Sequence, residues 1–291
     1  MSRKNKAYAK GKAKKVWYDT STDAPAAALR RMDKGAFKKL NALWHDLANI
    51  QSESGNSYVM ARYIDNFVRS LGLSAQVDAY GNMKVKAGTG QGKAFGLASH
   101  IDTVHEITST YKARMQKDEF GRTIWYANDG IGGDDKCGIA ICLWLLQKAA
   151  GSADVGPIEV FFFVDEEIGC QGSRQSAEQW YENLSCFVQP DRRGYNDLIN
   201  EYAGAVSTSD AFNEATVKVF ADFNYKSTAG LYTDVFQIQE THTEVSTVNI
   251  SCGYHRPHEA NEYVVLEQLV HATLLVEALE KALRGKAFPH K

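Results

Sequence analysis

Apolar and polar positions along the chain alternate between helical and strand-like spacing from about Asp33 onward. A three- to four-residue apolar period predicts a helix, and alternation or a short apolar run predicts a strand. The expected helices cover residues 36–50, 57–71, 138–149 and 262–283. The expected strands cover residues 75–86 (two strands around a turn at 80–82), 94–99, 159–164, 186–188, 216–223 and 246–252, with a more polar hairpin at 111–126.

This interleaving predicts the fold class. Helices that alternate with short, intensely apolar strands favour a three-layer α/β/α domain with a mixed, mainly parallel central sheet. In open sheets of this kind, ligands bind outside the carboxyl ends of the strands. We therefore look for chemistry in the residues that directly follow each expected strand.

Composition and length agree with one ordinary globular protein. The chain has 291 residues, of which 44% are hydrophobic and 23% charged, and this excludes collagen-like, coiled-coil and wholly disordered chains. Its longest apolar stretch, residues 138–146, is far shorter than the roughly 18 residues that suggest a membrane span. We expect no membrane partner.

Positive charge is concentrated at the start of the chain. The first 15 residues contain seven basic residues and no acid: Arg3, Lys4, Lys6, Lys10, Lys12, Lys14 and Lys15. Without these seven, the formal net charge of −2 becomes −9. We interpret residues 1–32 as a basic, disordered arm and residues 33–291 as a single catalytic domain. An acidic body disfavours nucleic acid as a partner, except through the arm.

The cysteines and the amino-terminal composition predict a cytoplasmic protein. The start of the chain lacks the apolar segment of a secretory signal, and its Lys-rich, Ser-poor composition is unlike a transit peptide. Five cysteines without a C-x-x-C spacing indicate buried thiols in a reducing compartment. They are Cys137, Cys142, Cys170, Cys186 and Cys252, and none lies beside an obvious histidine.

Two of the candidate sites are ambiguous when taken alone. His100 and Asp102 follow the strand at 94–99, where they suit either a metal site or a hydrogen-bonded loop pair. Asp134 and Asp135 lie in a glycine-rich segment before the apolar helix, where an aspartate either caps the helix or bridges two cations.

The strongest local signal is the run Asp165-Glu166-Glu167 after the strand at 159–164. Three adjacent acids repel one another, so a bound cation explains their place at the mouth of a buried sheet better than a solvated surface does. One glutamate can then ligate a metal while its neighbour handles the proton of the attacking water.

Later strands bring further candidates. Asp191 follows the strand at 186–188, and both His255 and His258 follow the strand at 246–252. Taken together, the residues after the strands supply the imidazole and carboxylate ligands that suit zinc and related divalent ions.

These motifs resemble those of the co-catalytic dizinc exopeptidases of the tripeptidase T, carboxypeptidase G and aminoacylase type. The resemblance runs from about residue 36 to residue 284. It rests on Ser-His-x-Asp, Gly-x-Asp-Asp-Lys-x-Gly, Asp-Glu-Glu-Ile-Gly, an aspartate after a later strand, and His-x-x-x-Glu-Tyr-Val. It implies a hydrolase that cleaves a peptide or related amide bond near a chain end, as an exopeptidase or aminopeptidase does.

The resemblance also implies a role for each matching residue. His100 and Asp191 would hold one metal ion, Glu167 and His258 the other, and Asp134 would bridge the two. The family ligand lies four positions before its Glu-aromatic-Val signature, which selects His258 over His255.

The catalytic roles follow in the same way. Asp102 would orient His100, and Glu166 would be the general base. We expect two divalent ions, zinc first, although cobalt and manganese accept the same ligands.

One departure from the family concerns its lid and dimerisation domain, on the order of 100 residues in relatives. Only 66 residues separate Asp191 from His258, so we expect no lid. The transition-state histidine that a lid contributes would then be missing. Tyr254 and His255 are weak candidates to replace it, and both also suit structural roles.

Alternatives remain open for the substrate and for several residues near the site. Arg192 and Arg193 either bind a substrate carboxylate or neutralise the acidic metal shell, and Thr233 and Asp234 are expected to line the cleft. The substrate is a small peptide or, in the alternative, an N-acyl amino acid deacylated by an amidohydrolase. A non-catalytic, metal-bound binding module is disfavoured, because a binder has no need of Glu166.

Overall fold

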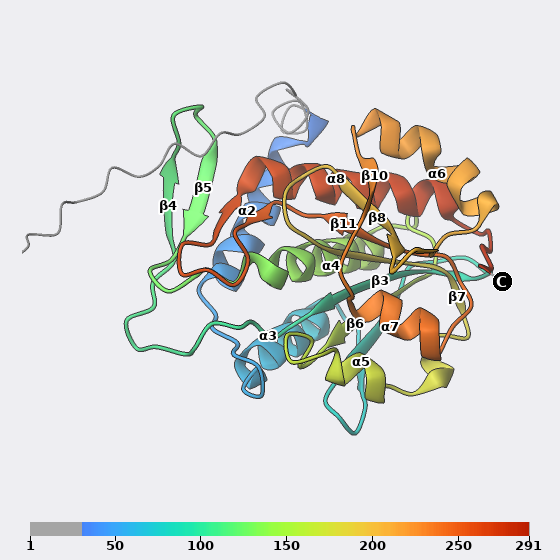
Figure 1. Cartoon of the computed structure of the whole chain (residues 1–291), viewed down its shortest axis with the longest axis horizontal. Helices are drawn as coiled ribbons and strands as arrows, with labels where there is room; N and C mark the ends of the chain where they lie inside the picture. Colours follow the sequence, from blue (N-terminus) through green and yellow to red (C-terminus); the bar gives the residue numbers. More distant parts are fainter. Residues whose placement is uncertain (1–30, 291) are drawn as a thin grey trace, which may run out of the picture.

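The computed structural model describes residues 31–290 of the chain. A nine-stranded sheet crosses the molecule with helices on both faces (Figure 1). The predicted basic arm falls almost entirely outside the described residues, although Met32, its last residue, is buried in the main core. None of the helices formed by residues 31–290 is long and apolar enough to cross a bilayer.

The main sheet has the order β1-β2-β6-β3-β7-β11-β8-β10, with β9 paired to β8. Its strands are β1 (Ala75–Val77), β2 (Met83–Ala87), β3 (Ala94–His100), β6 (Ile158–Phe163), β7 (Leu184–Arg192), β8 (Asp197–Tyr202), β9 (Ala205–Val206), β10 (Lys226–Ala229) and β11 (Thr247–Ser251). The four central strands β6, β3, β7 and β11 are parallel, whereas β2 and β8 flank them in antiparallel orientation. The mixed, mainly parallel sheet is thus confirmed, and the carboxyl ends of the central strands meet at one edge.

Helices cover both faces of this sheet. One face carries α2 (Lys34–Ala48), α4 (Gly133–Gly151), α6 (Asp210–Asp222) and α8 (Leu266–Leu283), with α3 (Tyr58–Ser70) packed against α4; the other carries α5 (Gln171–Gln175) and α7 (Asp234–Thr241). On β6, Phe162 belongs to the first core cluster, whereas Phe161 and Phe163 belong to the second. This two-residue alternation shows that both faces of the sheet are buried.

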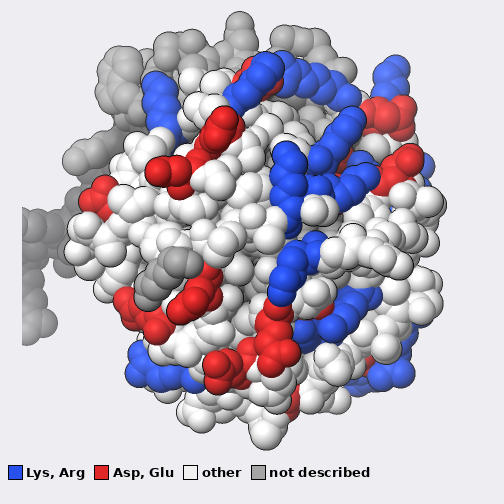
Figure 2. Space-filling model, turned by 90° about the vertical axis from the view of Figure 1, so that its right-hand side faces the viewer, with Lys and Arg blue, Asp and Glu red and all other residues white. Residues whose placement is uncertain are grey.

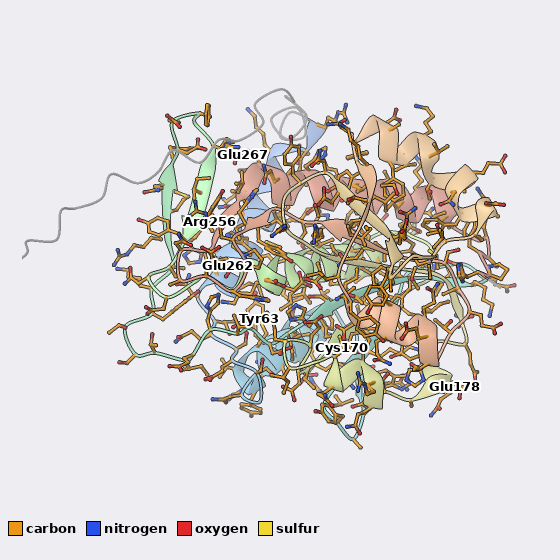
Figure 3. All side chains as sticks on the ribbon, in the orientation of Figure 1. Tyr63, Cys170, Glu178, Arg256, Glu262 and Glu267 are labelled. Carbon is orange, nitrogen blue, oxygen red and sulfur yellow. The ribbon has the colours of Figure 1, made fainter. Side chains whose placement is uncertain are left out.

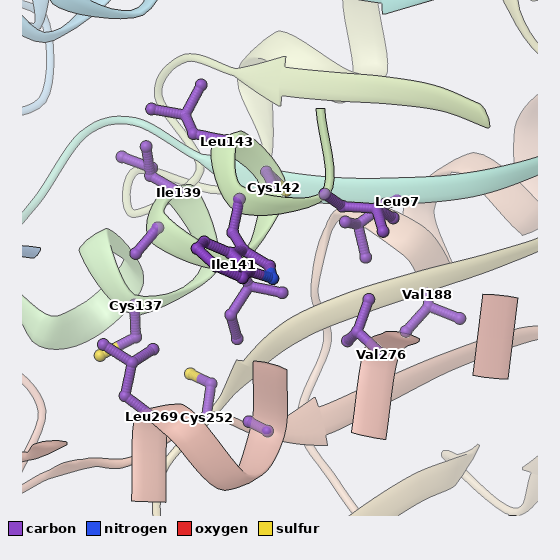
Figure 4. Packing of buried hydrophobic residues seen from close by; sticks show 14 of the residues in the cluster. Leu97, Cys137, Ile139, Ile141, Cys142, Leu143, Val188, Cys252, Leu269 and Val276 are labelled. Atoms are coloured by element: carbon purple, nitrogen blue, oxygen red, sulfur yellow. The ribbon is translucent and has the colours of Figure 1, made fainter. Parts of the chain in front are cut away.

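Helix α4 lies at the centre of the larger core. Its residues are apolar on every side, as is typical of a helix surrounded by protein, and Ile139 to Leu146 are all buried. Figure 4 shows Cys137 and Cys252 with their sulfur atoms on the same side of this core, near Leu269. All five cysteines are buried and unpaired, so none of them forms a disulfide.

A smaller antiparallel sheet of order β12-β13-β5-β4 stands beside the main one. The hairpin expected at 111–126 forms β4 (Arg114–Lys117) and β5 (Thr123–Tyr126). It pairs with β13 (Tyr263–Val265), which pairs in turn with β12 (Tyr254–His255). This pairing holds the loop between β12 and β13, which carries His258, against the rest of the molecule.

The strand predicted at 216–223 is wrong, because these residues lie mainly in helix α6. Ser209 caps this helix by accepting a 3.3 Å hydrogen bond from the Phe212 N–H. Phe212, Thr216 and Phe220 are spaced four residues apart and buried together. The β-branched residues suggested a strand, but packing of this stripe against α8 outweighs their weak intrinsic preference. The helix predicted at 262–283 begins later, at Leu266, after β13.

The 66 residues between Asp191 and His258 contribute to the main domain. They form β8, β9, α6, β10, α7, β11 and β12, and four of these strands belong to the main sheet. These residues therefore extend the main sheet and its helices.

Candidate metal centre

The predicted site residues come from the carboxyl ends of three parallel strands and from two loops. His100 ends β3, Glu167 follows β6, and Asp191 lies near the end of β7. Asp134 is at the start of α4, and His258 lies between β12 and β13. All of them except His100 line a cavity of about 420 Å³. His100 lies behind this lining, in contact with Asp134 and Asp191.

The carboxylate of Asp134 is the centre of this arrangement. Its Oδ1 lies 3.1 Å from Nε2 of His100, and its Oδ2 lies 3.5 Å from Nε2 of His258. The two imidazoles therefore face opposite oxygens of one carboxylate, although they are far apart in the sequence.

Two further carboxylates flank the histidines. Asp191 Oδ1 is 3.6 Å from His100 Nε2, and Glu167 Oε2 is 2.9 Å from His258 Nε2. The other oxygen of Glu167, Oε1, is buried without a hydrogen-bond partner among residues 31–290. A buried carboxylate oxygen without a donor is costly, and two imidazoles with three carboxylates form a donor set suited to divalent ions. The residues present therefore fit a metal centre.

Of the three adjacent acids after β6, Asp165 faces away from this centre. Its carboxylate accepts hydrogen bonds from the Gly55 N–H, at 2.7 Å, and from the Tyr80 hydroxyl, at 3.3 Å. Its backbone is left-handed, with φ of 57°, a conformation uncommon outside glycine. This turn separates Asp165, which holds the loop, from Glu166 and Glu167, which line the cavity.

Asp102 joins two parts of the site. Its carboxylate accepts hydrogen bonds from the Ser54 hydroxyl, at 2.7 Å, and from the backbone N–H of Glu166, at 3.0 Å. Its Oδ1 also lies 3.5 Å from Nδ1 of His100, and its backbone carbonyl lies 3.0 Å from the same nitrogen. Asp102 thus contacts both the imidazole of His100 and the loop that carries the two glutamates.

Glu262 was not singled out as a functional residue in the sequence, yet it supports the centre from behind. This fully buried carboxylate accepts hydrogen bonds from the backbone N–H groups of Gly132, at 2.7 Å, and Asp134, at 3.0 Å. His105 Nε2 lies 2.8 Å from it. Figure 3 places Glu262 beside the start of α4. The available signal was its place in the His-x-x-x-Glu-Tyr-Val motif.

The charges of the site strongly perturb the histidines. Hydrogen bonds to Asp134 and Glu167 raise the pKa of His258 to about 10. Burial alone would lower the pKa of His100, but the charge of Asp191 and hydrogen bonds to Asp102 and Asp134 outweigh it and hold that pKa well above its usual value. Both imidazoles are therefore stabilised as cations in the absence of metal.

The carboxylates are perturbed in opposite directions. Burial, followed by repulsion from Asp134, raises the pKa of Asp191 to about 7. Burial also raises the pKa of Glu166 well above its usual range. Asp134 resists the same effect of burial because it is hydrogen-bonded to both histidines, and its pKa lies below the usual range. The cluster therefore contains more carboxylates than its histidines neutralise, as expected where a cation binds.

Polar groups around Asp191 hold it from several sides. The hydroxyls of Tyr254 and Thr233 lie 3.3 Å and 3.1 Å from its oxygens, and Gln189 Nε2 donates to Oδ2 at 3.1 Å. Thr233 lines the cavity as expected, but Asp234 does not; it is buried behind the site and accepts a 3.4 Å hydrogen bond from Gln189.

His255 points away from the centre. Its Nε2 lies 2.6 Å from Oε1 of Gln268, and its ring stacks on Tyr263 at 4.9 Å between centroids. Of the two histidines that competed for a ligand role, only His258 lies within reach of Asp134 and Glu167.

Solved structures share this fold at low sequence identity. A tripeptidase from Staphylococcus aureus subsp. aureus Mu50 matches with a TM-score of 0.68 and 14% identity, over 85% of this chain and 98% of that chain. Aminopeptidase PepT from Bacillus cereus matches with a TM-score of 0.64 and 14% identity, over 85% and 98%. A TET aminopeptidase from a marine-sediment Thaumarchaeota archaeon matches with a TM-score of 0.67 and 13% identity, over 86% and 98%.

The family follows from the sequence itself. No curated protein matches the chain in a sequence search. However, the family model described as peptidase family M20/M25/M40 matches residues 96–281, which is well over half of the chain. This segment contains every residue of the candidate centre. The chain therefore belongs to peptidase family M20/M25/M40 and is a metal-dependent hydrolase of the peptidase class.

Proposed function

We propose that this protein is a dinuclear metal-dependent exopeptidase that hydrolyses a peptide bond near a chain end. The observation that carries the proposal is the position of the Asp134 carboxylate between His100 and His258, at 3.1 Å and 3.5 Å. A carboxylate shared by two imidazoles suits the bridge between two ions.

Each ion would have its own ligands beside this bridge. His100 and Asp191 would hold one ion, and Glu167 and His258 would hold the other. We propose zinc, with cobalt and manganese as ions that the same donors accept. When bound, the ions would polarise the scissile carbonyl and lower the pKa of water.

Glu166 is the proposed general base. Its carboxylate lines the cavity next to Glu167, and its one hydrogen bond from a side chain within residues 31–290 is a weak 3.6 Å contact from the Cys170 thiol. A carboxylate with so few partners is free to take a proton from water and to deliver it to the leaving amine. Asp102 contacts both the imidazole of His100 and the N–H of Glu166. It would therefore hold the proposed ligand and the proposed base in fixed positions relative to each other.

The exopeptidase assignment draws on the similar structures and on the cavity. Those structures include a tripeptidase and aminopeptidases, and about 420 Å³ accommodates a few residues of a peptide. The alternative substrate, an N-acyl amino acid, would be cleaved by the same residues at a related amide bond.

The proposal includes a cytoplasmic setting for this activity. All five cysteines are buried as free thiols, which suits a reducing compartment. Fractionation of the cells that produce the protein, with an antibody against the chain, would test this; recovery outside the cytoplasm would contradict it.

Metal depletion and reconstitution test the proposed function. The full chain is treated with a chelator, its metal content is measured by elemental analysis, and turnover is followed on free dipeptides, free tripeptides, amino-terminally blocked peptides and N-acetyl amino acids. We expect loss of turnover without metal, recovery with two ions per chain, and preference for free short peptides. Preference for N-acetyl amino acids would support the amidohydrolase, and turnover unaffected by chelator would refute the metal mechanism.

A further inference from the structure

Two arginines directly follow the proposed ligand Asp191, and the fold uses them differently. Both line the cavity beside the candidate centre. Arg192 donates from Nε to Oδ2 of Asp197 at 3.1 Å and is thus held by the protein itself. Arg193 is exposed, and no acidic oxygen among residues 31–290 lies within 4 Å of its guanidinium nitrogens. Its guanidinium is available to a ligand.

The backbone places Arg193 at a defined distance from the metal ligands. Arg193 lies two positions after Asp191, and two residues of extended chain span about 7 Å. Its carbonyl accepts a 2.7 Å hydrogen bond from the Ser251 hydroxyl, and the next N–H, of Gly194, donates to the Tyr254 carbonyl at 2.8 Å. The base of the side chain is therefore anchored on both sides.

The contacts do not support a role for Arg193 in neutralising the acidic shell. Within the described residues, Asp134, Asp191 and Glu167 pair with histidines and not with this arginine. His255, nearby, contributes no positive charge, because burial and then the charges of Arg122, Arg193 and Arg256 lower its pKa to about 4. Arg193 is thus a cation at a cavity wall with no acidic ion-pair partner among residues 31–290.

Part of the cavity wall is apolar. Ile199, Ala229, Leu231 and Pro257 line the same cavity as Arg193. The cavity therefore combines the acidic residues of the candidate metal centre, several apolar side chains and the guanidinium of Arg193, which has no ion-pair partner among residues 31–290. A short peptide carries groups that match these three features: a scissile carbonyl, an apolar side chain and a terminal carboxylate.

We propose that Arg193 binds the free α-carboxylate of the substrate, so that the enzyme selects short peptides whose carboxyl terminus lies in the cavity. The guanidinium donates two parallel hydrogen bonds to a carboxylate, a geometry that a lysine cannot reproduce. This inference rests on the proposed function and narrows its substrate class. It makes Arg193 a specificity-determining residue.

The test compares an acid with its amide. The metal-reconstituted full chain is assayed on leucyl-leucine and on leucyl-leucine amide, which differ only in the terminal carboxylate. We expect the wild type to favour the acid by about 10- to 100-fold in kcat/KM, in keeping with hydrogen bonds to a charged group. Arg193→Gln should remove that preference by raising KM for the acid and leave the amide unaffected. Equal kcat/KM for the two substrates in the wild type would overturn the proposal.

Two further variants separate specificity from charge. Arg193→Lys keeps the charge but loses the paired geometry, so the preference should fall to an intermediate value. Arg114→Gln removes an exposed arginine on β4, outside the cavity lining, and should retain the full preference. Loss of bound metal in Arg193→Gln, or an equal loss of activity on acid and amide, would assign Arg193 to the acidic shell and overturn the inference.

A binding measurement keeps this inference distinct from the proposed function. Calorimetry with D-leucyl-D-leucine and its amide, on wild type and Arg193→Gln, reports carboxylate recognition without turnover. Selective binding of the acid by the wild type alone supports the role of Arg193 even if no peptide is hydrolysed. Turnover of peptides with equal binding of acid and amide refutes the carboxylate site while the proposed function stands.

Discussion

A buried glutamate lies near each end of strand β6, and the negative charges of the two are compensated by different kinds of residue. Near its start, Glu159 is 2% exposed and pairs with Lys84 at 2.6 Å and with Lys86 at 3.1 Å. Beyond its end, Glu167 has only a histidine, His258, as ion-pair partner among the described residues. The first carboxylate is neutralised by two lysines, whereas the second is paired only with a histidine, whose charge is lost when it gives up its proton.

This difference separates a structural ion pair from a site prepared for a ligand. Lysines near Glu159 make its charge independent of any other molecule, whereas the carboxylates around Asp134 need protons or a metal. The face at the amino-terminal ends of the strands, near the C-terminus, carries a band of lysine and arginine side chains in Figure 2. Those basic side chains lie at the other end of the strands from the acidic cluster, so they do not neutralise it.

The largest predicted effect belongs to the Glu166 carboxylate. Glu166→Gln keeps the shape of the side chain but cannot accept the proton, so kcat should fall by about 100- to 10,000-fold, while elemental analysis finds the metal content unchanged. Glu178→Gln, in a surface turn away from the cavity and labelled in Figure 3, should retain wild-type activity. Unchanged turnover in Glu166→Gln would remove the base assignment.

Loss of a proposed ligand should lower metal content. In His258→Ala, the partner of Asp134 and Glu167 is missing, and metal affinity should fall by more than about 100-fold, the upper range seen when a residue behind a ligand is removed. His255→Ala serves as control, because its imidazole contacts Gln268 instead, and it should keep both ions. Full metal occupancy in His258→Ala would contradict the ligand assignment.

The structural ion pair should affect stability and not chemistry. Glu159→Gln leaves Lys84 buried with no opposite charge, which costs about 3–5 kcal/mol of unfolding free energy. Lys86→Gln removes a lysine that is 61% exposed, and its cost should stay below about 1 kcal/mol. Urea denaturation measures both values. A loss of activity per folded molecule in Glu159→Gln would show that the two ends of β6 are coupled.

A further predicted effect is a pH dependence of metal binding. Without metal, the raised pKa of His258, about 10, keeps it protonated at neutral pH, so a metal ion must displace that proton. Apparent affinity should therefore rise with pH between 6 and 8, by up to about tenfold per pH unit for each proton released. Competition with a chromophoric chelator at several pH values measures this, and an affinity that does not change would contradict it.

The stability of the metal-free fold should have the opposite dependence on pH. The pKa of His258 is higher in the folded chain than its ordinary value of 6.5. Its pairing therefore contributes fully below about pH 6.5 and is lost as the pH rises toward 10. Thermal unfolding of the metal-free protein across this range would show whether the sign is correct.

Much of the fold could be predicted, because its elements have strong local patterns. The strands at 94–99 and 159–164 and the apolar helix at 138–149 are close to β3, β6 and α4. The strand prediction at 216–223 was wrong because this segment contains both β-branched residues and an apolar stripe with helical spacing. Packing against α8 favours the helix. Short segments with mixed signals are resolved by packing and not by propensity.

At the candidate site, the sequence predicted which types of residue are present but not which way their side chains point. Asp165, Glu166 and Glu167 were three adjacent acids that only the family resemblance distinguished, and the left-handed turn at Asp165 separates an anchoring acid from two that line the cavity. Likewise, the sequence offered the same two roles for Arg192 and Arg193. The structure distinguishes them, because only Arg192 donates a hydrogen bond to Asp197. Side-chain direction in such loops depends on partners that are distant in the chain.

The sequence by itself determined the alternation of helices and strands and the kinds of side chain that follow each strand. Both are local properties, since hydrophobic period and residue order act over a few positions. Only the tertiary structure decided that the oxygens of Asp134 face His100 and His258, and that Glu262, 128 residues away, holds the Asp134 N–H. These relations depend on long-range packing and hydrogen bonds between segments, which no local pattern contains.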